Sequence, residues 1–143
     1  MKTSGVALAI FLLSAGFLSA EQELTIRRGG SLWAEIDSGG QIRIEGSLVG
    51  RWEDDGEVRK DGTIAGRVES DGKIRRGGTL VGDIEADGTF RKEGTIVGRI
   101  EDDGTIRKGG SIWGSVAEGC PGHEAKRKVA AVLVFFAADY FGD

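Results

Sequence analysis

The sequence predicts an all-β fold: a closed or near-closed radial array of short antiparallel hairpins, followed by an apolar C-terminal tail. Three observations carry this prediction, namely a 16-residue repeat, apolar residues at even positions of the repeat, and glycine at its turns. The chain has 25 glycines and one proline. Their spacing is too regular for a flexible linker and lacks the every-third-residue period of collagen, so we assign the glycines to turns.

The repeat restarts with glycine every 16 residues and has no insertion. The six units begin at Gly30, Gly46, Gly62, Gly78, Gly94 and Gly110. A half unit (24–29) precedes them, and the last unit loses the pattern at CPGH (120–123). With the first glycine as position zero, positions two, six and twelve are apolar, which predicts strands with one buried face. In the fifth unit, GTIVGRIEDDGTIRKG, that face would contain Ile96, Ile100 and Ile106.

The turns follow from the same pattern. A three-residue loop ending in Asp-Gly, as at Asp103-Gly104, places position six opposite position twelve, apolar against apolar. A two-residue loop would instead oppose position six to an arginine, so we predict the longer loop. The next connection then pairs position twelve with position two of the following unit. Glycine at position four, in mid-strand, predicts a bend or a close approach of two backbones.

Both ends of the repeat are incomplete, and the two halves complement each other. Residues 24–29 supply a short strand without a partner, whereas 111–116 supply a long strand whose short partner is replaced by CPGH. Because unpaired sheet edges are a liability, we expect the first strand to close the ring against the last.

The recurring G-R-I-E-x-D-G-T-I-R motif (98–107, with variants at 66–75 and 82–91) follows an apparent export signal and precedes a short apolar tail. In these features residues 24–116 resemble the five-fold beta-flower proteins of bacteria. The resemblance implies a small closed or near-closed radial array of hairpins, and it carries no established activity over to this chain.

The first twenty residues predict a signal peptide, because Lys2 precedes an apolar run (6–13) and small residues lead to Ala20. The run is shorter than the ~20 residues of a membrane-spanning helix, so we expect cleavage after Ala20; an uncleaved anchor is the alternative. The expected organisation is a signal peptide (1–20), a hairpin repeat domain (21–117), a linker or exit turn (118–128) and an apolar tail (129–143). The protein would then be exported, to the periplasm, the cell surface or the medium.

Arginine occupies position thirteen and an acidic residue position seven, both facing outward on neighbouring strands within diagonal reach. The two form either weak surface ion pairs or a column of arginines that binds an anionic glycan or lipid head group. Glycoside hydrolysis needs two carboxylates in different environments, and the repeat makes these equivalent, which argues against catalysis. The candidate binding surface contains Arg43, Arg59, Arg75, Arg91, Arg107, Trp33 and Trp113.

Position three is apolar although it is odd. Its residues are Trp33, Val49, Ala65, Val81, Val97 and Trp113. Outward-facing apolar side chains in every unit require either a second layer that covers them or a partner that binds them. Ring closure would make Trp33 and Trp113 neighbours across the seam; in an open ring they would cap two separate ends.

The remaining reactive residues predict no cofactor and no metal. Cys120 and His123 form C-x-x-H, but two ligands alone rarely make a metal site, and we interpret CPGH as an exit turn. Because Cys120 is the single cysteine, an internal disulfide is excluded and an intermolecular one is the alternative. Without residues 1–20 the chain has 18 basic and 23 acidic side chains (18 − 23 = −5), so nucleic acid is not expected as a partner.

The apolar run from Val129 to Ala138 follows three basic residues and is too short to span a bilayer as a helix. We expect it to plug the ring as a helix or strand; membrane-surface attachment and self-association through Val129 to Phe141 are the alternatives. Together these observations predict an exported structural or interaction module that is not an enzyme. A glycan- or anion-binding scaffold on the arginine column, or a protein held at a membrane by its tail, is the alternative function.

Overall fold

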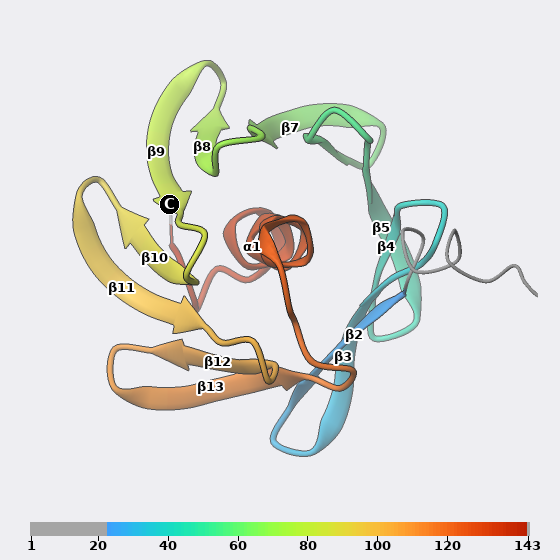
Figure 1. Ribbon diagram of the computed structural model, residues 1–143. Helices are drawn as coiled ribbons and strands as arrows, with labels where there is room; N and C mark the ends of the chain where they lie inside the picture. The colour runs from blue at the N-terminus through green and yellow to red at the C-terminus, as the bar shows by residue number, and fades with distance from the viewer. Residues whose placement is uncertain (1–22, 143) are drawn as a thin grey trace, which may run out of the picture.

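A computed structural model describes residues 23–142, and the expected signal peptide lies outside them. Twelve antiparallel strands form a closed barrel, arranged as six hairpins that radiate from a central helix like petals (Figure 1). The strands are β2 (Leu24–Arg28), β3 (Ser31–Ile36), β4 (Gln41–Ile44), β5 (Ser47–Trp52), β6 (Glu57–Lys60), β7 (Thr63–Val68), β8 (Lys73–Arg76), β9 (Thr79–Ile84), β10 (Thr89–Lys92), β11 (Thr95–Ile100), β12 (Thr105–Lys108) and β13 (Ser111–Val116).

The ring closes where the sequence predicts it. Strand β2 pairs with β13, with Arg27 opposite Ser115 and Ile26 opposite Val116. The half unit and the degraded last unit therefore join the sixth hairpin to the first. Every described strand has a hydrogen-bonded neighbour on both sides, which removes the exposed edges that promote aggregation.

The three-residue loops are also confirmed. Ile100 lies opposite Ile106, and both are fully buried. The loop is closed by a hydrogen bond from the Gly104 N–H to the Glu101 carbonyl at 2.9 Å, and Gly104 has a φ of 100°. This left-handed conformation is the reason for glycine at position ten, because a side chain there would be strained.

The expected pairing of position twelve with position two is wrong. Phe90 lies opposite Gly98, and Arg91 lies opposite Ile96, because a bulge inserts Val97 as an extra residue in β11. A bulge of this kind reverses the side-chain alternation on one strand. Ile96 is therefore 58% exposed on the outer wall, whereas Val97 packs against the core. The same bulge recurs in the other hairpins, so position three faces inward throughout, contrary to our expectation.

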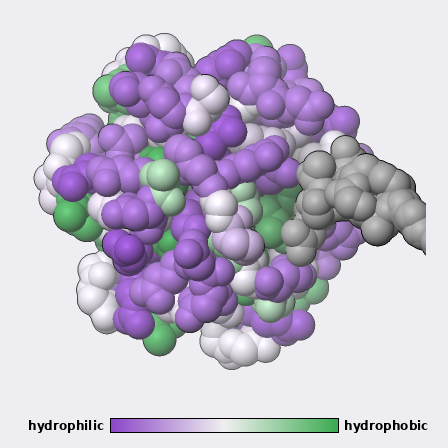
Figure 2. All heavy atoms as spheres, in the orientation of Figure 1, coloured by the Kyte–Doolittle hydropathy of each residue, from purple (hydrophilic) through white to green (hydrophobic). Residues whose placement is uncertain are grey.

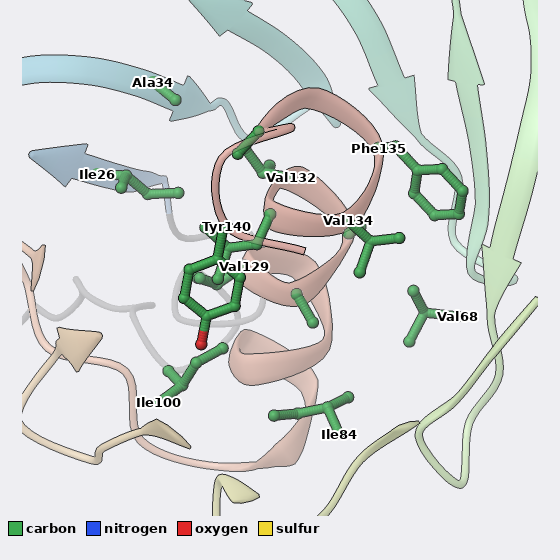
Figure 3. Close-up of a cluster of buried hydrophobic side chains, with 14 of the residues drawn as sticks. Ile26, Ala34, Val68, Ile84, Ile100, Val129, Val132, Val134, Phe135 and Tyr140 are labelled. Carbon is green, nitrogen blue, oxygen red and sulfur yellow. The ribbon is translucent and has the colours of Figure 1, made fainter. Parts of the chain in front are cut away.

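The C-terminal segment forms the predicted plug. Helix α1 (His123–Phe136) runs through the barrel, and Val129 to Val134 are almost fully buried around its circumference (Figures 1 and 3). A helix that is apolar on all sides is stable only when it is surrounded, which the ring of hairpins provides. The helix begins at His123, so residues 123–128, expected to be a linker, belong to it.

The mid-strand glycines mark the close approach that the sequence predicts. A Cβ atom on a glycine at position four would overlap a carbonyl oxygen of the neighbouring strand and, in four units, would lie within 3.0 Å of an aromatic side chain of the plug. The pairs are Gly50 with Phe136, Gly66 with Phe135, Gly82 with Phe141, and Gly98 with Tyr140. Because these glycines have no side chain, they leave sockets in the barrel wall, and the C-terminal aromatic residues occupy them.

Candidate functional site

The arginines of position thirteen lie on the outer wall, distributed around the barrel, and each is partly exposed. Most pair with the acidic residue at position seven of the same unit. The Nε–Oε2 distances are 2.7 Å for Arg75 and Glu69, 2.6 Å for Arg91 and Glu85, 2.7 Å for Arg107 and Glu101, and 3.4 Å for Arg59 and Glu53. The fold therefore does not bring the arginines together into one cationic site.

These ion pairs contribute little to stability individually. Their side chains are about one-third exposed, so each pair adds roughly 0.2–1 kcal/mol after solvent screening. Their larger effect is to neutralise the positive charge of the arginines. Because each guanidinium already faces a carboxylate, an anionic ligand would have to displace that carboxylate before it gains a full ion pair.

The residue opposite each of these arginines is an exposed aliphatic side chain, as Ile96 is opposite Arg91. This ring of position-two residues is 45–66% exposed and consists of Leu32, Leu48, Ile64, Leu80, Ile96 and Ile112. In Figure 2 hydrophilic side chains cover most of the visible face, and hydrophobic residues show as separate spots rather than one continuous patch.

Trp33 and Trp113 lie next to each other at the seam of the barrel, which is the boundary where β13 pairs with β2. Trp33 and Trp113 form a T-shaped pair with ring centroids 5.5 Å apart, and Trp113 makes a second such pair with Tyr140 at 5.3 Å. The Arg28 guanidinium lies over the Trp113 ring, 3.8 Å from its centroid. The prediction that ring closure makes the two tryptophans neighbours is confirmed.

Asp139 connects this aromatic cluster to the plug. Its Oδ2 accepts hydrogen bonds from Arg28 (2.7 Å) and from the Trp113 indole N–H (3.2 Å). Partial burial alone would raise the pKa of the Asp139 carboxyl, but the two hydrogen bonds outweigh it and hold the pKa below its usual value. The carboxylate is therefore charged at neutral pH and compensates the charge of Arg28.

A set of basic residues at position fourteen was missed by the sequence reasoning. Their side chains face inward and donate hydrogen bonds to carbonyls at the C-terminal end of the plug: Arg76 to Val134 (3.1 Å), Lys60 to Phe135 (3.3 Å) and Lys92 to Phe141 (2.8 Å). Lys108 similarly contacts the Asp139 carbonyl. Arg76 and Lys60 thereby satisfy carbonyls that a helix leaves unpaired in its last turn, where positive charge is favourable, whereas Lys92 and Lys108 bind carbonyls of the segment that follows the helix. The sequence did contain a signal for them, because position fourteen is even and even positions were expected to face the interior, where a basic residue needs a partner.

The other end of the plug is held by residues of the helix itself. The His123 Nε2–H donates to the Ile84 carbonyl (2.8 Å), and Arg127 donates to the carbonyls of Val68 and Glu69 (both 2.8 Å). Lys126 is fully buried, contacts Asp102, and donates to the Cys120 carbonyl at 2.7 Å. Each of these basic groups therefore has a structural hydrogen bond.

Cys120 and His123 do not form a reactive pair. The Cys120 thiol is buried, and burial raises its pKa to about 11, so it is protonated at neutral pH. Within residues 23–142 no group of three or more His, Cys, Asp and Glu side chains is placed to hold a metal ion. In the same range no helix is long and apolar enough to cross a bilayer.

The fold and the seam define a class: a closed, helix-plugged barrel of six repeated hairpins. No family model, no curated protein and no solved structure matches the chain. The resemblance to the five-fold beta-flower proteins therefore stays a prediction.

Proposed function

We propose that this protein is an exported, non-enzymatic structural or interaction module, related to the beta-flower proteins. One observation carries the proposal: the side chains best suited to catalysis are used to hold the plug. His123 and Lys126 bind carbonyls, Tyr140 donates to the Arg107 carbonyl at 2.7 Å, and the Cys120 thiol is buried. Burial also raises the pKa of the Tyr140 hydroxyl, which disfavours its ionised form.

The experiment is a search for turnover with matched variants. The purified chain is incubated with chromogenic esters, glycosides, phosphates and peptides, beside the variants Cys120→Ser and His123→Gln. We expect no turnover above the buffer rate, and lower stability for His123→Gln. Turnover that either substitution abolishes, while the variant remains folded by circular dichroism, would contradict the proposal. N-terminal sequencing of the exported chain should begin at Glu21.

An anion- or glycan-binding scaffold on the arginine column is the second candidate. It is supported by the partial exposure of these guanidinium groups, which are 34–37% exposed in Arg59, Arg75, Arg91 and Arg107. Retention on a sulfated-glycan column should then fall steeply with salt, because exposed charges are screened. Retention that does not change with salt would exclude this candidate.

Attachment to a membrane through the tail has less support. The apolar residues that would insert, including Val132 and Leu133, are fully buried in the barrel. Deleting residues 126–143 should therefore destabilise the barrel. Release of a folded chain from membranes to the soluble fraction would instead support a membrane anchor.

A further inference from the structure

The seam between β13 and β2 differs from the other boundaries of the barrel. At position three the four central units carry small aliphatic residues, whereas the two units that flank the seam carry Trp33 and Trp113. Both indoles are only partly buried, although the residues on the same face deeper in the barrel, such as Ile26, are fully buried. Two partly exposed indoles thus lie at the place where the repeat breaks.

An open cavity of about 420 Å³ lies against these rings. Besides the two indoles it is lined by Leu32 and by three side chains able to form hydrogen bonds, Arg28, Ser31 and Glu45. Glu45 belongs to the turn of the neighbouring hairpin, and its backbone N–H donates to the Trp33 carbonyl at 2.8 Å. The cavity therefore combines two indole rings with a donor, an acceptor and a hydroxyl, contributed by adjacent hairpins.

This combination fits a sugar ring. A pyranose presents C–H groups on its faces, which pack on the electron-rich face of an indole, and hydroxyls around its edge, which need donors and acceptors. We propose that the seam cavity binds a neutral oligosaccharide, with Trp33 as the stacking surface and Arg28, Ser31 and Glu45 as hydrogen-bonding groups. Trp113, whose ring is covered by the Arg28 guanidinium at 3.8 Å from its centroid, supports Trp33 from the side. The proposal rests on the proposed function as an interaction module and names its ligand class.

The charges of the seam favour a neutral over an acidic sugar. Arg28 is compensated by Asp139 at 2.7 Å, and Glu45 adds a further negative charge to the cavity. A guanidinium has five N–H donors, so Arg28 can contact a hydroxyl while it keeps its bond to Asp139. A carboxylated or sulfated glycan would meet Glu45 without a free cation to offset it.

The test is isothermal titration calorimetry of the folded chain with cellohexaose, chitohexaose and maltohexaose. We expect saturable binding of at least one of them, unaffected by salt. Trp33→Val, which introduces the residue that three other units carry at this position, and Glu45→Gly, which introduces the turn residue of three other hairpins, should each weaken binding by at least about tenfold. Leu80→Ala is the matched control, because Leu80 is the exposed equivalent of Leu32 on β9 and does not line the cavity; this variant should bind like the wild type.

Two results would overturn the proposal. One is the absence of binding to all three oligosaccharides by a chain that circular dichroism shows to be folded. The other is binding that survives both seam substitutions, or that Leu80→Ala removes. Chromatography of the incubated oligosaccharides separates this outcome from failure of the proposed function: shortened products would refute the non-enzymatic module, whereas intact sugars without binding would refute the seam site alone.

Discussion

Replacing Gly66 by alanine tests whether the plug is fitted to the mid-strand glycines. The added Cβ would lie 2.5 Å from Cζ and 2.7 Å from Cε1 of Phe135, and it would overlap the Arg75 carbonyl oxygen. Carbon atoms pack at about 3.5–4.0 Å, so the Phe135 ring would have to move by roughly 1 Å. Phe135 is buried, with 7% of its surface exposed. Overpacking of this kind costs about 1–3 kcal/mol of unfolding free energy.

Gly114→Ala is the matched control. Its Cβ would also meet a backbone oxygen, at 2.6 Å, but its nearest side-chain atom is Cγ of Arg28 at 3.6 Å, an ordinary contact. The first unit already carries alanine at this position, the buried Ala34. We therefore expect Gly66→Ala to lose at least ~1 kcal/mol more than Gly114→Ala in urea denaturation.

A double-mutant cycle decides whether the ring is the cause. Phe135→Leu should cost less in the Gly66→Ala background than in the wild type, because the smaller side chain relieves the overlap. Equal losses for the two glycine variants, or strict additivity with Phe135→Leu, would refute the reasoning that aromatic rings of the plug occupy sockets left by glycine.

Three further predictions concern single positions. Glu93 has a φ of 51°, so Glu93→Asn should raise the unfolding free energy by about 0.5–1 kcal/mol, measured in urea; an unchanged midpoint would count against strain in this turn. Burial, together with the charge of Glu85, raises the pKa of Asp83, and its buried Oδ1 has no hydrogen-bond partner among residues 23–142. The wild type should thus lose stability relative to Asp83→Asn as the pH rises above about 4, and parallel stability curves from pH 3 to 7 would contradict this. Because burial raises the pKa of Cys120 to about 11, a thiol reagent at pH 8 should label it rapidly only after denaturant is added; fast labelling of the folded chain would show that the thiol is accessible.

Local rules were sufficient to predict the turns, the ring closure and the plug. The loop ending at Gly104 was predictable because only one loop length opposes Ile100 to Ile106, and the two incomplete units at the ends could satisfy each other's backbone groups only by pairing. The apolar run from Val129 to Ala138 was expected to plug the ring because it is too short for a bilayer, although membrane-surface attachment and self-association would also have covered it.

The bulge could not be predicted from alternation. Counting residues from Phe90 assumes regular pairing, and the extra residue Val97 changes which side chains face the core only after that point. For the same reason Ile96 was expected inside and Trp33 outside, although Trp33 lines the inner side of the seam and contacts the plug cluster through Trp113. The basic residues of position fourteen were missed because their partners are carbonyls, which the pattern of side chains does not show.

The plug also matches the size of the ring. The turns and the bulge are the same in every hairpin, so the local structure of one hairpin does not by itself state how many of them close the ring. A helix with its side chains is about 10–12 Å across, however, and here it contacts glycines in hairpins on several sides of the ring. A wider ring would move Gly82 and Gly98 away from Phe141 and Tyr140, which pack against them. A narrower ring would leave no room for the helix. The plug, which follows the hairpins in the sequence, is thus fitted to a ring of six.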